Sequence, residues 1–229
     1  MAPTQPSSAA QPDATAKPEV ESGPVLPRGT FAARSRARWL DVWGGPDADA
    51  GVRWRLWWKN DFHQPVSFLV DGTERDDEEN PWLHLQLGAR RNVQEGWVRL
   101  DDVRVQRVRE RIVVDLSSRE LVRFRDDRVV ARFSVGVGAP EFPTVPGRYF
   151  VWAKVFYEPA GVYGTLALGL SGFSNTITDW PGGGRLAIHG TADPGDRGQP
   201  VSHGCVRVYS PEMQRLADVA MGTPVIIHS

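Results

Sequence analysis

One short stretch of this sequence gathers the residue types that perform nucleophilic chemistry. Cys205, the only cysteine of the chain, lies in the run 202–207, Ser-His-Gly-Cys-Val-Arg, and a second histidine precedes it in the run 188–190, Ile-His-Gly. A thiol of ordinary pKa is mostly protonated at neutral pH, and it attacks a carbonyl well when a neighbouring imidazole accepts its proton. The stretch therefore indicates acyl transfer by a cysteine that is paired with a histidine.

Two histidines qualify as the partner of this thiol. His203 stands two residues before Cys205, and in an extended segment their side chains point to the same side. His189 stands sixteen residues before Cys205 and reaches it only if the chain folds back. Residues 190–200 between them are rich in Gly, Pro and Asp, which is typical of a surface loop that returns one strand to another. Spacing alone leaves both histidines open.

Two other readings compete with catalysis. A free cysteine is often a small buried apolar residue, and a lone histidine is often a hydrogen-bonded core residue. A metal site is less favoured, because one Cys and two His give three ligands, without CxxC or HxxxH spacing, whereas a structural zinc needs four. We therefore expect neither a metal nor another cofactor.

Further segments accompany the two histidine motifs in a fixed order. They are 113–116 followed by 121–124, then 135–138, the turn 143–147, 170–174, and the closing segment 222–227. Together with His189-Gly190-Thr191 and the run 202–207, these segments resemble the L,D-transpeptidase catalytic domain, the YkuD-like family of peptidoglycan-modifying cysteine enzymes. The resemblance covers about residues 109–229.

The resemblance implies a role for each matching residue. Cys205 would be the acylated nucleophile, and His189 its general base, oriented by the backbone carbonyl of Gly190. The backbone N–H groups of Gly204 and Cys205 would face the developing oxyanion, each contributing about 3 kcal/mol.

The remaining motif residues would support this pair. Ser202 and His203, with Gly204, would shape the pocket. Arg207 would support the loop or contact a substrate carboxylate. The loop between His189 and Ser202, twelve residues long, is at or slightly below the short end of the family's range.

The implied reaction is a two-step acyl transfer on peptidoglycan stem peptides. The thiolate would attack the carbonyl after the third residue of a tetrapeptide stem, and an amine would then take the thioester to form a 3-3 cross-link. If water takes the thioester, the enzyme is an L,D-carboxypeptidase. The resemblance also implies acylation by carbapenems.

Two further classes of function stay open. One is a cell-wall cysteine hydrolase of the NlpC type, in which the nucleophile precedes the histidine; here His189 comes first, which argues against it. The other is a cell-wall-binding scaffold without activity.

Composition bounds the partners and the location. The chain has 229 residues, 41% of them hydrophobic, and a formal net charge of −1, so no electrostatic argument favours nucleic acid. No stretch approaches the ~20 apolar residues that span a bilayer. The first eight residues lack the regions of a secretory signal. We expect a protein of the cell envelope, periplasmic or extracellular, whose signal or anchor has been removed.

Composition and hydrophobic patterning divide the chain into three regions. Residues 1–28 hold six of the eighteen prolines and no aromatic residue, which predicts a flexible Pro/Ala-rich linker. Residues 31–108 read as short strands separated by turns. Their polar loop at 90–92, the Gly-Trp-Val at 96–98 and the acidic pair before 103–105 resemble the end of a bacterial SH3-like domain. Residues 109–229 would form the catalytic domain.

The sequence therefore predicts a mainly β protein, a small SH3-like β-barrel followed by a β-rich YkuD-like domain. In the first part, one expected strand stops at Asp71-Gly72. The tryptophans of residues 31–108 admit two interpretations. They could form a platform for sugar rings or peptide, or they could fill a small core, and the second is favoured.

One helix is clearly signalled near the C-terminus. Ser210 would cap it, Pro211 would take its first position and Gly222 would close it. Its inner face would be apolar, formed by Met213, Leu216, Val219 and Ala220.

Overall fold

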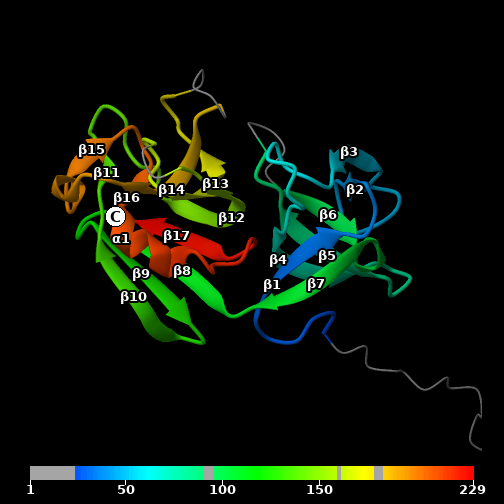
Figure 1. Ribbon diagram of the computed structural model, residues 1–229. Coiled ribbons are helices and arrows are strands. Elements are labelled where there is room, and N and C mark those ends of the chain that lie inside the picture. The colour runs from blue at the N-terminus through cyan, green and yellow to red at the C-terminus, as the bar shows by residue number, and fades with distance from the viewer. Residues whose placement is uncertain (1–23, 90–94, 159–160, 178–182) are drawn as a thin grey trace, which may run out of the picture.

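The computed structural model describes residues 24–89, 95–158, 161–177 and 183–229 (Figure 1). The predicted linker up to residue 23 and the predicted polar loop at 90–92 lie outside the described residues. The mainly β fold is confirmed, because nearly all regular structure falls into three sheets. No helix within the described residues combines the length and apolar character needed to cross a membrane.

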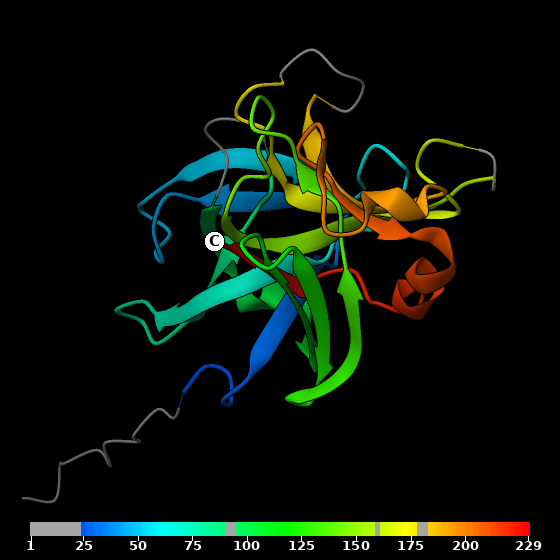
Figure 2. The ribbon, with the colours of Figure 1, turned by 90° about the vertical axis from the view of Figure 1, so that its left-hand side faces the viewer.

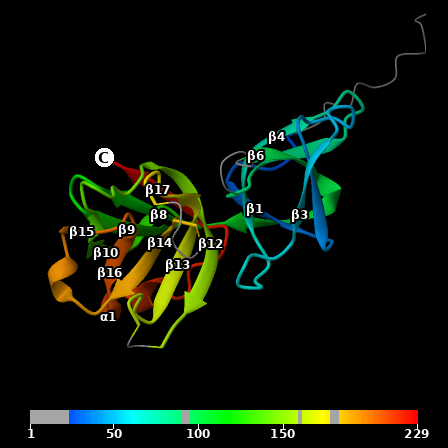
Figure 3. The same ribbon diagram turned by 90° about the horizontal axis from the view of Figure 1, so that it is seen from above.

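The first part of the chain forms one antiparallel sheet of seven strands, in the order β3-β2-β6-β5-β4-β1-β7. Figure 3 shows that this sheet is curved. Its barrel-like form matches the expectation, while the SH3-like relationship stays a prediction. Its elements are β1 Thr30–Ser35, β2 Trp39–Trp43, β3 Val52–Trp57, β4 Phe68–Arg75, β5 Pro81–Gln86, β6 Glu95–Arg99, the 3-10 turn η1 Leu100–Asp102 and β7 Val103–Val108.

The strand expected to end at Asp71-Gly72 continues through these residues. β4 runs to Arg75, and its pairing with β5 shifts register between Val70 and Gly72, so the Asp-Gly pair forms a bulge rather than a turn. The chain reverses later, at Asp76, whose carboxylate accepts the backbone N–H groups of Glu78 and Asn80. The predicted end of this strand was therefore wrong.

The second part forms a mixed sheet of eight strands, in the order β10-β9-β8-β17-β12-β13-β14-β16. Two pairs in it are parallel, β8 with β17 and β14 with β16. A separate parallel pair joins β11 and β15. The strands are β8 Glu110–Asp115, β9 Glu120–Arg125, β10 Arg128–Ser134, β11 Val137–Gly138, β12 Gly147–Phe156, β13 Leu166–Phe173, β14 Arg185–Thr191, β15 Pro200–Ser202, β16 Val206–Tyr209 and β17 Pro224–His228.

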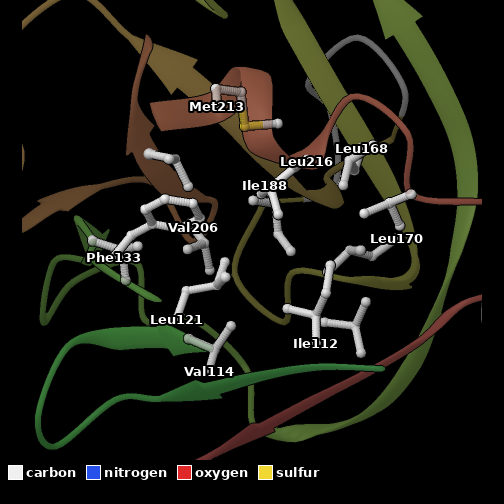
Figure 4. Packing of buried hydrophobic residues seen from close by; sticks show 14 of the residues in the cluster. Ile112, Val114, Leu121, Phe133, Leu168, Leu170, Ile188, Val206, Met213 and Leu216 are labelled. Atoms are coloured by element: carbon white, nitrogen blue, oxygen red, sulfur yellow. The ribbon is translucent and has the colours of Figure 1, made fainter. Parts of the chain in front are cut away.

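The core of this part is mainly aliphatic and buried (Figure 4). Ile112 of β8, Leu168 of β13 and Ile188 of β14 have no exposed surface, and their side chains point into one space. Met213 and Leu216 close it from the segment after β16. Burying a side chain of this size stabilises a fold by about 1.5–3 kcal/mol.

The predicted helix is shorter than expected. The α-helix α1 covers only Ser210–Met213, and a 3-10 turn, η3 Gln214–Leu216, continues it beside β14 and β16 (Figure 2). Ser210 does not cap it, because its hydroxyl donates to the carbonyl of Thr191 instead. Three of the four expected inner residues are fully buried, whereas Ala220 is exposed. Gly222 ends the segment with a φ of +85°.

Strand β12 contributes side chains to the apolar cores of both large sheets. Phe150, Trp152 and Ala153 of β12 pack into the apolar cluster of the first sheet, whereas Val151 packs into the core of the second. Val25 and Leu26, which the prediction placed in the linker that ends at residue 28, also pack against the first cluster.

Polar contacts fix the same junction. The side-chain amide of Asn60 donates to the carbonyl of Trp152 at 3.0 Å. Gln64 donates to the carbonyl of Lys154 at 2.6 Å and accepts its backbone N–H at 3.1 Å. These bonds add directionality to the apolar contact at β12.

A charge network around the buried Arg123 ties the hairpin β8-β9 to the chain after η3. Arg123, 4% exposed, pairs with Glu110 at 2.8 Å and with Asp218 at 2.6 Å, and donates to the carbonyl of Arg215. Arg125 contacts the same two carboxylates. These contacts hold the pKa of Asp218 well below its usual range.

We expect Glu110→Ala to lower the free energy of unfolding by about 3 kcal/mol, because it leaves the buried Arg123 without its main partner. The matched control is Glu120→Ala, which removes the surface pair Glu120–Arg132 and should cost less than about 1 kcal/mol. Urea unfolding followed by tryptophan fluorescence measures both. Equal losses in the two variants would contradict the role given to the network.

Candidate active site

The parallel pairing of β14 with β16 brings the two sequence motifs together. The register aligns Ile188 with Val206 and His189 with Arg207. Cys205 directly precedes β16 and therefore lies beside Ala187 on the neighbouring strand. The run 188–190 and the run 202–207, separate in sequence, thus become adjacent strands.

The buried apolar side chains determine which face of the sheet His189 and Cys205 occupy. Ile188 and Val206, together with Val208, are buried in the core of the second sheet. Because side chains alternate along a strand, His189 and Cys205 face the opposite side of the sheet, as diagonal neighbours. The structure brings these two predicted residues together on one face.

The imidazole of His189 is held in one orientation. Its Nδ1 lies 2.8 Å from the carbonyl oxygen of Gly190, and because a carbonyl has no proton to give, Nδ1 is the donor. Nε2 is then the free acceptor, as a general base requires. The ring of Tyr163 meets the imidazole edge to face at 5.1 Å.

Burial keeps this imidazole neutral. His189 is 4% exposed, and burial lowers its pKa to about 4, although the bond to Gly190 opposes the shift. The charge of Arg207 lowers this pKa further, and that of Asp196 raises it. At neutral pH His189 is therefore ready to accept a proton.

Cys205 is also shifted toward its neutral form. The residue is partly exposed, yet its neighbours pack densely around the thiol, and this burial raises the pKa of Cys205. A backbone hydrogen bond from Ala187 and the charge of Arg207 oppose the rise. The resting pair is thus a thiol and a neutral imidazole rather than a thiolate and an imidazolium.

His203 does not share this arrangement. Gly204 adopts a φ of +109°, which breaks the extended path between His203 and Cys205 that would place their side chains on one side. His203 is exposed, and its ring lies against Phe142 at 4.7 Å. The structure therefore favours His189 over His203 as the partner of the thiol.

Ser202 organises the turn that presents the cysteine. Its side chain, 2% exposed, donates to the carbonyl of Cys205 at 2.5 Å and accepts the backbone N–H of Gly204 at 3.1 Å. The Gly204 N–H, expected to face an oxyanion, is donated to Ser202 in this structure, and its role toward an oxyanion stays a prediction.

A close approach of backbones pins the strand before this turn. Ser202 of β15 pairs with Gly138 of β11. A Cβ at Gly138 would lie 2.3 Å from the carbonyl oxygen of Phe142 and 2.4 Å from the amide of Thr144, which leaves room for glycine only. The predicted segments 135–138 and 143–147 thus support the Ser202 turn from below.

Arg207 reaches the loop rather than open solvent. Its Nη1 lies 3.2 Å from Asp196, which also accepts the hydroxyl of Thr191 at 2.7 Å. Its Nε is buried and has no hydrogen-bond partner among the described residues. Of the two roles expected for Arg207, these contacts describe support of the loop.

Sequence reasoning assigned no role to Asp196, Thr191, Ala187 and Tyr163. An Asp in a Gly- and Pro-rich loop carries no signal of its own, and the contact of Tyr163 depends on tertiary packing.

Within the described ranges, no three His, Cys, Asp or Glu side chains gather as a metal site would need.

Comparison with known protein families gives a match over the second part of the chain. The model of the YkuD family, the L,D-transpeptidase catalytic domain, matches residues 109–227, more than half of the chain. The chain therefore belongs to the L,D-transpeptidase catalytic domain family.

Individual relatives share the same region. The chain is similar to the YkuD proteins of Bacillus licheniformis (32% identical over 118 residues) and Bacillus subtilis (27% over 118 residues). Each match covers 51% of this chain and 64% or 65% of the relative, so the chain spans less than two thirds of these proteins. A solved L,D-transpeptidase from Mycobacterium smegmatis is 13% identical over 88% of this chain and all of that one, with a TM-score of 0.46.

We expect His189 to make the protein less stable in mild acid. Its folded pKa of about 4 lies below the ordinary 6.5, so the unfolded chain binds the extra proton first as the pH falls. Its contribution is complete above pH 6.5, and on the order of 3 kcal/mol is lost by about pH 4. The measurement is urea unfolding of wild type and His189→Gln at several pH values. Curves that stay parallel would contradict this account.

Removal of the Ser202 hydroxyl should destabilise the turn. Ser202→Ala leaves the Gly204 N–H and the Cys205 carbonyl without their partner, at a cost of about 1–3 kcal/mol. Ser134→Ala, on the exposed side of β10, is the matched control and should change stability by less than about 0.5 kcal/mol. Thermal unfolding compares the two variants, and equal shifts would refute the bridging role.

Proposed function

We propose that this protein is a peptidoglycan L,D-transpeptidase in which Cys205 is the nucleophile and His189 the general base. One observation carries the proposal: the two residues lie on the same face of paired strands, and the bond from His189 Nδ1 to Gly190 leaves Nε2 free to accept the thiol proton. Family membership supplies the substrate class, the stem peptides of the cell wall.

The first half-reaction forms a thioester. Sγ of Cys205 bonds to the carbonyl carbon after the third residue of a tetrapeptide stem, while its proton moves to Nε2 of His189. The tetrahedral intermediate then collapses, the bond to the terminal D-residue breaks, and the imidazolium returns the proton to the leaving amine. Because both groups rest in their neutral forms, proton transfer accompanies attack.

The second half-reaction releases the enzyme. The side-chain amine of a neighbouring stem attacks the thioester carbon, the carbon–sulfur bond breaks, and the amine proton passes through His189 to the thiolate. The product is a 3-3 cross-link. If water attacks instead, the product is a tripeptide stem and the protein acts as an L,D-carboxypeptidase.

Four neighbouring residues support Cys205 and His189. Ser202 and Gly204 shape the turn that presents Cys205, and Gly190 orients His189. Arg207 places a positive charge that favours a thiolate over a thiol and a neutral over a protonated imidazole. It is also the candidate to contact a substrate carboxylate.

The proposal places the protein in the cell envelope, where its substrate lies. It also includes acylation of Cys205 by carbapenems, since their strained carbonyl suits the same attack. An inactive wall-binding scaffold is the competing function, and it predicts neither turnover nor acylation.

We expect the purified protein to release the terminal D-residue from a disaccharide-tetrapeptide, whereas Cys205→Ala releases none. His189→Ala should slow turnover by about 10²–10⁴-fold, the usual contribution of a general base. His203→Ala should stay within about tenfold of wild type, and His63→Ala, in the loop between β3 and β4, is the neutral control. Mass spectrometry of the products separates a cross-linked dimer from a hydrolysed tripeptide.

Intact-mass analysis after incubation with meropenem gives an independent readout. Wild type should carry one adduct, and Cys205→Ala none. A folded wild-type protein that shows neither turnover nor adduct would overturn the enzymatic function in favour of the scaffold.

A further inference from the structure

A cavity with an unusual charge lies in the first sheet, in a part of the chain that the proposed reaction does not use. Its volume is about 340 Å³, within the range of small-ligand sites. Four arginines line it, Arg34, Arg36, Arg38 and Arg104. The other lining residues are Ser35, Ala37, Trp58, Pro65 and Val66.

These four arginines differ from many others in the chain. Arg55 pairs with Asp41, and Arg148 with Asp71. Among the described residues, by contrast, none of the four cavity arginines takes part in an ion pair with a carboxylate. Four guanidinium groups around one cavity repel each other, and a bound anion would relieve that repulsion.

Two of the guanidinium groups are held in place by the protein. Nε of Arg34 donates to the hydroxyl of Ser67, and Nε of Arg36 donates to the carbonyl of Val103 at 2.9 Å. With Nε occupied by the protein, the two Nη groups of each remain to bind a ligand. A guanidinium group fixed in this way loses little conformational entropy when it binds a ligand.

Backbone bonds hold the loop that carries the arginines. The N–H of Arg36 donates to the carbonyl of Asp102, and the carbonyl of Arg38 accepts the N–H of Trp58. Lys59 adds a further positive charge, because its Nζ lies 4.7 Å from the centre of the Trp58 ring. The cavity thus combines exposed arginines on a rim held by hydrogen bonds, a local excess of positive charge and one aromatic wall.

We propose that this cavity binds a phosphate-bearing ligand, a phosphomonoester or phosphodiester. Guanidinium groups bind phosphate oxygens through paired N–H bonds, and several of them together match the charge of one or two phosphates better than that of a single carboxylate. The apolar wall of Trp58 and Pro65 suits the organic part of such an ester. This site goes beyond the proposed cell-wall reaction and does not depend on it.

The test is calorimetric titration of the full chain with pyrophosphate and with glycerol 2-phosphate, and with tricarballylate as a carboxylate of similar charge. We expect the two phosphates to bind, and to bind more weakly as salt is added. Arg36→Gln/Arg104→Gln should weaken phosphate binding by at least about tenfold, because each lost guanidinium removes charge-assisted hydrogen bonds.

The control is Arg53→Gln/Arg128→Gln, which removes the same charge from exposed positions outside the cavity. This variant should bind phosphate within about twofold of wild type, and thermal unfolding verifies that both double variants fold. Absence of phosphate binding to wild type, or an equal loss in the control, would overturn the site. Tricarballylate binding as tight as that of pyrophosphate would overturn the assignment to phosphate.

Discussion

The parallel pairing of β14 with β16 is the constraint on which the rest of the site depends. Parallel neighbours cannot be joined by a tight turn, so the chain must leave the sheet after Thr191 and return at Val206. Ile188 and Val206, buried in the core, fix the register, because a slip by one residue would turn His189 into the core and Ile188 out of it. Packing of apolar residues thus positions the polar pair.

Strand β12 connects the strand pair that carries the site to the first sheet. Its side chains are buried on both faces, with Val151 in one core and Phe150 and Trp152 in the other. A strand covered on both sides reads as a continuous apolar run, as 150–153 does. Since β13 and β14 follow β12 in the sheet order, the strand that carries His189 is two positions away from the contact between the two sheets.

The sequence predicted the candidate site residues better than it predicted the local backbone structure around them. Cys205 could be singled out because few residue types serve as nucleophile, whereas spacing left His189 and His203 open and only the family resemblance favoured His189. The predicted helix was too long, because the buried Leu216 and Val219 are reached as well by 3-10 and irregular turns as by a continuous helix. The tie from Asp196 to Arg207 could not be predicted, since it depends on how a polar loop folds over the sheet.

The raised pKa of Cys205 has a consequence for the survival of the protein. Peroxides and other oxidants attack thiolates far faster than thiols, and the higher oxidised forms of cysteine cannot be reduced again. A nucleophile stored as a neutral thiol, beside an imidazole that stays unprotonated, therefore resists oxidation between turnovers. Burial, which slows the first attack on substrate, thereby keeps the only cysteine of the chain in the form that oxidants attack slowly.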